Sequence, residues 1–144
     1  MEENIQRFII LTGLPASGKT TWAKKYCDMN PKAVRVSRDD IRAMLVPSFV
    51  HGGGMEDLVT EIENHCIVEA LLMGYSVIVD ATNFRGVERF YSLIPMENND
   101  IEVEIRDFDV DLQTCIQRDS QREKPVGKLV IEGMYKKYLL KKEL

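Results

Sequence analysis

Short apolar segments alternate along the chain with longer segments of helical periodicity. The segments at 7–11 (RFIIL) and 76–80 (SVIVD) are apolar and β-branched, which is typical of strands buried on both faces. The predicted strands are 7–11, 33–37, 76–80 and 101–108, and the predicted helices are 20–29, 39–45, 55–73, 88–94, 111–120 and 128–140. Strands that alternate with helices pair in parallel, so we expect a three-layer α/β/α sandwich with a mostly parallel sheet of about four to five strands.

The segment 55–73 carries the longest helical pattern. Its apolar residues recur at a spacing that predicts one buried face, and Gly74 is placed to end the helix. The residues expected on that face are Met55, Leu58, Val59, Ile62, Cys66, Ala70 and Met73. Residues 47–54 before this helix are expected to be a loop, and the glycines at 52–54 together with the helix that starts at Met55 are candidates for a mobile wall of a binding site.

Length and composition indicate the number of domains and the class of protein. A chain of 144 residues is the commonest size for one domain, and we expect a single domain over 1–144. The net charge of −4 argues against a protein that coats long nucleic acid, although it allows a grip on one strand end. The first residues lack the features of a signal peptide, and no apolar segment is long enough to cross a membrane.

The three cysteines, Cys27, Cys66 and Cys115, are odd in number and widely separated. They lack the spacing of a metal finger or a disulfide framework, so we expect reduced thiols buried in the core of a cytoplasmic protein. The two histidines, His51 and His65, do not form a metal-ligand pattern with neighbouring thiols or carboxylates.

The residues GLPASGKT at 13–20 match the pattern G-x-x-x-x-G-K-[ST] between a predicted strand and a predicted helix. Glycines let the backbone turn its N–H groups toward phosphates, and the helix adds the positive end of its dipole. We therefore predict a nucleoside triphosphate with Mg²⁺, with Lys19 on the β and γ oxygens and the Thr20 hydroxyl on the metal ion. The predicted nucleotide contacts here are Gly13, Pro15, Ala16, Ser17, Gly18, Lys19, Thr20 and Thr21.

The segment SRDDIR at 37–42 follows the second strand, whose end shares a sheet edge with the phosphate-binding loop. One interpretation is a capping box, in which Ser37 and Asp40 bond each other's backbone. Asp39 and Arg42 lie three residues apart on one helical face, where a carboxylate could take the proton of an acceptor hydroxyl and a guanidinium could grip its phosphate. A simple surface ion pair is the alternative.

Four blocks together resemble the kinase domain of the phage-type 5′-polynucleotide kinases. They are LTGLPASGKTTWAKKY, VSRDDIR, VIVDATNFRGVER and the stretch from CIQRDSQREKPVG into MYKKY. The resemblance implies a P-loop kinase with a C-terminal lid helix that moves the γ-phosphate of ATP to the 5′-hydroxyl of DNA or RNA. It also implies that Asp39 is the general base and that Arg42 holds the phosphate on the 3′ side of the acceptor nucleotide. The phosphatase or ligase module that often accompanies such a kinase is absent from this sequence.

Arg118 and Arg122 lie four apart on the predicted helix before Pro125 and Gly127. In phosphoryl transfer a well-placed arginine neutralises phosphate charge, and the resemblance implies a lid that supplies arginines to ATP. We expect Arg122 to be the main contact and Arg118 the second. Basic residues that only complement a helix dipole are the alternative.

Asp80 ends an apolar strand, as a metal-supporting acid does in many phosphate-loop enzymes, but it could also cap the turn at 81–83. Asp80 and Asn83 are candidate substrate contacts. Arg85 and Arg89 could contact the nucleotide, the acceptor or only solvent, and the sequence does not distinguish these options. Two further functions stay open: a small-metabolite kinase for a nucleoside or sugar acid, and a nucleotide-binding module without transferase activity.

Overall fold

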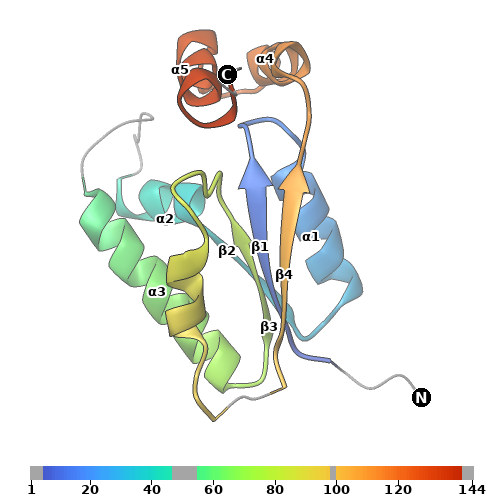
Figure 1. The fold of residues 1–144 in the computed structure, drawn as a ribbon, viewed down its shortest axis with the longest axis vertical. Helices are drawn as coiled ribbons and strands as arrows, with labels where there is room; N and C mark the ends of the chain where they lie inside the picture. The colour runs from blue at the N-terminus through green and yellow to red at the C-terminus, as the bar shows by residue number, and fades with distance from the viewer. Residues whose placement is uncertain (1–4, 47–54, 98–99, 141–144) are drawn as a thin grey trace.

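The structure, a computed structural model, describes residues 5–46, 55–97 and 100–140. Four parallel strands form one sheet in the order β2-β3-β1-β4 (Figure 1). The strands are β1 (Arg7–Gly13), β2 (Ala33–Ser37), β3 (Ser76–Asp80) and β4 (Glu102–Phe108). The helices are α1 (Lys19–Met29), α2 (Arg38–Leu45), α3 (Glu56–Leu72), α4 (Leu112–Ser120) and α5 (Lys128–Met134), with a 3₁₀ helix η1 (Glu88–Leu93) and a π-helical turn η2 (Tyr135–Leu139).

Strand β1 is buried on both faces because helices cover both sides of the sheet. Phe8 and Ile10 pack in the cluster that includes α2, α3 and η1, whereas Ile9 and Leu11 pack with Ala23 of α1. Side chains alternate between the faces of a strand, so a continuous apolar sequence is required here. This arrangement confirms the predicted three-layer α/β/α sandwich, and the sheet has four strands in the described residues.

Helices α4 and α5 lie beyond the carboxyl ends of β1 and β4, above the arrowheads in Figure 1. A third apolar cluster holds them together, with Leu14, Cys115 and Ile131 at its centre. Leu14 belongs to the loop after β1, so the segment from α4 to α5, called the lid below, packs directly on the predicted phosphate-binding loop.

The predicted buried face of α3 was partly wrong. Its buried residues are Val59, Glu63, Ile67 and Leu71, at a spacing of four, whereas Leu58 is 47% exposed. A hydropathy pattern excludes Glu63 from a core because it is charged, which shifts the expected face around the helix. Cys66 is exposed, contrary to the expectation of core thiols, while Cys115 is buried and Cys27 is partly buried.

The ends of several elements differ from the prediction. The short helix predicted at 88–94 is a 3₁₀ helix that spans Glu88–Leu93, and 128–140 changes from α-helix to π-helix at Tyr135. Gly74 has a positive φ of 88°, as expected for a residue that ends a helix. The loop predicted at 47–54, with His51, lies outside the described residues. None of the helices in the described ranges is long and apolar enough to span a membrane.

Candidate active site

The loop between β1 and α1 has the backbone conformation of a phosphate cradle. Gly13, Ala16 and Gly18 have positive φ angles of 145°, 65° and 102°. A Cβ atom at Gly13 would lie 2.9 Å from the Phe108 carbonyl oxygen, so this position requires glycine. Gly18 precedes the first residue of α1, which directs the N-terminal end of the helix dipole into the loop.

Lys19 lies across the mouth of this loop. Its Nζ donates hydrogen bonds to the carbonyl oxygens of Gly13 at 2.8 Å and Leu14 at 2.6 Å, and the residue is 7% exposed. Burial lowers the pKa of the Lys19 ammonium to about 8, against the opposing attraction of Asp80. The ammonium is therefore held at the position where phosphate oxygens would enter.

Thr20, Asp80 and Arg35 form a polar group beside the loop. The Thr20 hydroxyl donates to Asp80 Oδ2 at 2.8 Å, and Arg35 Nε donates to the same oxygen at 2.8 Å. One interpretation of the sequence was that Asp80 caps the turn at 81–83. Its side-chain partners, Thr20 and Arg35, both lie outside that turn. Arg35 was not a predicted site residue, because its role depends on a neighbour 45 residues away.

The donor set at this position fits Mg²⁺. A hydroxyl and a carboxylate oxygen are hard ligands, and Mg²⁺ commonly takes one or two protein oxygens together with waters and substrate phosphates. No three His, Cys, Asp or Glu side chains cluster as metal ligands within the described ranges, so nothing there forms a cage of protein ligands alone. Thr20 would hold the ion, which would supply charge neutralisation on the phosphates when bound.

The start of α2 differs in part from the predicted capping box. Ser37 Oγ accepts a hydrogen bond from the Asp40 backbone N–H at 3.2 Å, as a cap does. The Asp40 carboxylate, however, accepts from Arg35 Nη1 at 2.5 Å instead of returning to Ser37. Ser37 pairs in register with Asp80, so α2 begins at the same sheet edge as the Thr20–Asp80 pair.

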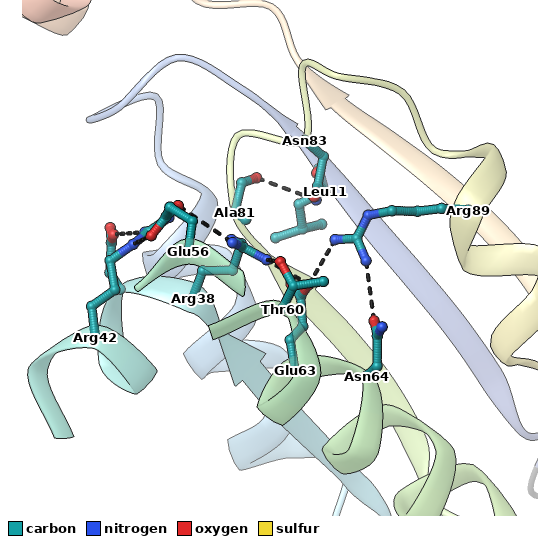
Figure 2. Close-up of polar contacts among 11 residues, drawn as sticks. Leu11, Arg38, Arg42, Glu56, Thr60, Glu63, Asn64, Ala81, Asn83 and Arg89 are labelled. Carbon is teal, nitrogen blue, oxygen red and sulfur yellow. Dashed lines mark hydrogen bonds and ion pairs between the residues drawn. The ribbon is translucent and has the colours of Figure 1, made fainter. Parts of the chain in front are cut away.

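Asp39 and Arg42 face each other on α2, as their spacing predicted. Arg42 Nη1 donates to Asp39 Oδ1 at 2.7 Å. Arg42 also donates from Nε and Nη2 to the two carboxylate oxygens of Glu56, at 2.9 Å and 2.5 Å (Figure 2). The Asp39 side chain is 70% exposed while that of Arg42 is 16% exposed. Glu56 was not a predicted site residue, since it comes from α3.

One cleft of about 1550 Å³ joins these groups. Its walls include Lys19 and Thr20 from the loop and Asp39 and Arg42 from α2, so the candidate base and the candidate phosphate cradle share one space. The predicted site residues that line it are Pro15, Ala16, Gly18, Lys19, Thr20, Thr21, Asp39, Arg42, Asp80, Asn83, Arg118 and Arg122. Gly13 and Ser17 lie behind the lining, where Ser17 Oγ accepts from Lys19 Nζ at 3.3 Å.

The lid side of the cleft carries Arg118 and Arg122. The prediction that both lie on one helix was wrong, because α4 ends at Ser120 and Arg122 follows in the connecting loop. Buried Asp119 fixes that loop by accepting from the backbone N–H groups of Val126 and Gly127, both at 2.9 Å. Arg122 Nη1 lies 3.5 Å from Asp119 Oδ1, so the arginine is tethered but 42% exposed to the cleft.

The loop after β3 forms another part of the lining. The Asn83 side-chain amide donates to the Leu11 carbonyl at 2.6 Å, which leaves its oxygen as the atom available for an acceptor contact. Phe84 and Tyr138 stack with their ring centroids 5.3 Å apart, and both line the cleft. Hydrogen bonds from Arg85 lower the pKa of the Tyr138 hydroxyl. The aromatic pair was not predicted, because its members are far apart in the sequence.

Comparison with known proteins identifies the fold of the chain that carries this site. Over 135 residues the chain is 31% identical to the L-seryl-tRNA(Sec) kinase of Methanococcus maripaludis, covering 90% of the chain and 51% of that protein. The chain thus spans about half the length of this curated relative.

Two solved structures show the same architecture. A chain in the Pnkp1/Rnl/Hen1 RNA repair complex superposes with a TM-score of 0.76 at 24% identity, over 95% of this chain and 45% of that one. The Mycobacterium tuberculosis APS kinase CysC, solved with AMPPNP and APS, gives a TM-score of 0.53 at 23% identity, over 83% of this chain and 71% of that one. At these identities the likeness establishes the fold, which is that of P-loop kinases.

The model of a family described as an AAA domain matches residues 8–139. That range includes the phosphate-binding loop, α2, and the lid with Arg118 and Arg122. P-loop kinases of this architecture use ATP with Mg²⁺. The chain therefore belongs to the AAA domain family and has the P-loop kinase fold.

Proposed function

We propose that this protein is a polynucleotide 5′-hydroxyl kinase, which transfers the γ-phosphate of ATP to the 5′-hydroxyl end of DNA or RNA. The observation that carries the proposal is the shared cleft, which is lined both by Asp39 and Arg42 of α2 and by Lys19 at the phosphate-binding loop. A second structure of the Pnkp1/Rnl/Hen1 complex, with a chain 25% identical to this one and a TM-score of 0.67, supports it.

The chemistry follows from the placement of these groups. Asp39 takes the proton of the 5′-hydroxyl while the hydroxyl oxygen bonds to the γ-phosphorus, and the bond from that phosphorus to the bridging oxygen breaks to release ADP. Lys19 and Arg122 neutralise charge on the transferring phosphate, with Arg118 in support. Arg42 holds the acceptor phosphate on the 3′ side through its planar donors.

In this proposal Asp80 and Asn83 lie beside the acceptor site as substrate contacts. Asp80 orients Thr20, the proposed Mg²⁺ ligand, through the hydrogen bond between their side chains. The ion, when bound, supplies charge neutralisation on the phosphates. Of the remaining loop residues, Ala16, Gly18 and Thr21 line the cleft and supply backbone and hydroxyl contacts to ATP. Gly13 and Ser17 position Lys19, whose Nζ donates to the Gly13 carbonyl and the Ser17 hydroxyl.

A second candidate function is a kinase for another hydroxyl. The curated relative is named a seryl-tRNA(Sec) kinase and the APS kinase shares the fold, so an aminoacyl-tRNA or a small metabolite is an alternative acceptor. A nucleotide-binding module without transfer is a third candidate, and it is distinguished by ATP binding without a labelled product.

The test is an acceptor panel with γ-labelled ATP and Mg²⁺. The panel contains 5′-hydroxyl DNA and RNA oligonucleotides, their 5′-phosphorylated counterparts, seryl-tRNA, APS and a mixture of nucleosides and sugar acids. We expect label only on the 5′-hydroxyl oligonucleotides. Label confined to seryl-tRNA or to metabolites would overturn the proposal in favour of the second candidate.

A further inference from the structure

Three arginines alternate with two glutamates in a continuous row of ion pairs beside the proposed acceptor site (Figure 2). In spatial order the row is Arg42, Glu56, Arg38, Glu63 and Arg89, and α2, α3 and η1 supply its members. The proposed function uses only the Arg42 end of this row. The three arginines all line the cleft, so the row forms part of the cleft wall next to Asp39 and Arg42.

Glu63 is the fixed point of the row. Its Oε1 accepts from Arg38 Nη1 at 2.9 Å and from Arg89 Nη2 at 2.6 Å, and the side chain is fully buried. One arginine would be enough to neutralise this carboxylate. Arg38 also pairs with Glu56, so the row ends on Arg89, whose acidic partner is shared with Arg38. The positive charge at this end of the row attracts an anion from the cleft.

Both guanidinium groups are held in fixed orientations. Arg38 Nη1 also donates to Thr60 Oγ1 at 3.1 Å, and its side chain is 15% exposed. Arg89 packs on the Phe90 ring, 4.0 Å from its centroid, and donates from Nη1 to Asn64 Oδ1 at 3.1 Å. A held guanidinium loses less side-chain entropy when it binds a phosphate than a free one does.

Arg89 retains capacity for a ligand. Within the described residues, two of its five N–H donors are used, one on Glu63 and one on Asn64. Its side chain is 40% exposed. Three donors are left, and Arg89 lines the cleft.

We propose that Arg38 and Arg89, positioned by Glu63, bind a second acceptor phosphate, one nucleotide further along the strand than the phosphate held by Arg42. This inference rests on the proposed function and makes it narrower, because the preferred acceptor then carries at least two phosphates. Arg89 is a substrate-binding residue in this scheme, and Glu63 is a positioning residue that acts through the two arginines.

The test measures binding separately from transfer. Equilibrium affinity is measured, with ADP and Mg²⁺ present, for a nucleoside 3′-monophosphate and for the dinucleotide that carries one additional phosphate. We expect the wild-type protein to bind the dinucleotide about tenfold more tightly, since a charge-assisted contact to phosphate is worth that much. Arg89→Ala should lose this preference and keep its affinity for the monophosphate.

Two further variants separate binding from structure. Arg7→Ala is the matched control, because Arg7 is also 40% exposed, has one acidic partner in Glu102, and lies outside the cleft lining. It should keep the tenfold preference. Glu63→Gln should reduce the preference, because a neutral amide oxygen holds the two guanidinium groups less strongly than a carboxylate does. Arg89→Lys should restore part of the preference that Arg89→Ala loses, by keeping the charge.

The outcomes distinguish this inference from the proposed function. A wild-type protein that binds both ligands equally, or an Arg89→Ala variant that weakens both equally, overturns the second phosphate site. If the preference and its loss are observed but no label reaches a 5′-hydroxyl end, the anion site stands and the kinase assignment fails. If label reaches oligonucleotides but the preference is missing, the kinase assignment stands and this inference fails.

Discussion

Glu56 and Arg42 join α3 to α2 through a pair of parallel hydrogen bonds, from Arg42 Nε to Oε2 at 2.9 Å and from Nη2 to Oε1 at 2.5 Å. A carboxylate in this geometry uses the same planar donors that a bound phosphate would use. The hydrogen bonds from Arg42 lower the pKa of Glu56 to about 2, so the pair stays ionised throughout the neutral range. In the proposed function, Glu56 would therefore compete with the acceptor phosphate for Arg42.

We predict that Glu56→Gln lowers the KM for a phosphate-bearing acceptor by about fivefold. The Glu56 side chain is half exposed, so solvent screens the pair and limits its worth to about 1 kcal/mol. Steady-state kinetics with a 5′-hydroxyl oligonucleotide measure the change, with the KM for ATP as the internal control. A higher acceptor KM in this variant would mean that Glu56 orients Arg42 instead of competing with the acceptor.

Removal of the Asp39 carboxylate should abolish most transfer while leaving nucleotide binding intact. A positioned general base contributes about 10² to 10⁴-fold, and we expect Asp39→Asn to lower kcat by that factor. Asp39 is exposed on α2, so the substitution should not disturb the core. Asp28→Asn is the control, because Asp28 is an exposed acid on α1 outside the cleft lining. Unchanged kcat in Asp39→Asn would remove the base from the mechanism.

Nucleotide affinity should fall as the pH rises through the pKa of Lys19. In the free protein this pKa is lowered to about 8, whereas bound phosphates favour the charged ammonium and raise it. Below pH 8 the charge is already present, and above it each binding event must take up a proton. We expect about tenfold weaker ATP binding at pH 9 than at pH 7, a range that lies above the phosphate pKa of about 6.

Calorimetric titration with a non-hydrolysable ATP analogue measures this pH profile. Lys19→Met should bind weakly at every pH and show no fall between pH 7 and pH 9, since it has no proton to lose. A slope in the variant equal to that of the wild-type protein would assign the titration to another group, such as Tyr138, whose hydroxyl has a lowered pKa.

Asp119 should be the main support of the loop that carries Arg122. Its two oxygens accept from the N–H groups of Val126 and Gly127, and a buried charge-assisted hydrogen bond is worth about 1.5 to 3 kcal/mol. We predict that Asp119→Ala lowers the free energy of unfolding by about 3 kcal/mol and raises the KM for ATP. Asp119→Asn keeps one acceptor oxygen and should lose about half as much.

Denaturant unfolding and ATP kinetics together check the role of Asp119. Arg122→Ala is the companion variant: it should raise the KM for ATP or lower kcat but leave unfolding nearly unchanged, because its side chain is 42% exposed. If Asp119→Ala unfolds at the same denaturant concentration as the wild-type protein, the loop is held by other contacts.

The sequence alone determined the features that depend on neighbouring residues. The strands at 33–37 and 76–80 have the predicted bounds, and the phosphate-binding loop with Lys19 follows its strand as expected. The facing pair of Asp39 and Arg42 also follows from helix geometry, because a spacing of three fixes the relative direction of two side chains. These features need only local backbone conformation and periodicity.

The tertiary structure decided the partners of the charged residues. Glu63 is buried in α3 because Arg38 and Arg89 reach it from residues 25 and 26 positions away, and a hydropathy pattern gives no sign of such a neutralised charge. Arg35 meets Asp80, and Glu56 meets Arg42, for the same reason. Whether a carboxylate is solvated or paired depends on which elements the fold brings together. The sequence of one local segment does not determine which distant segments pack against it.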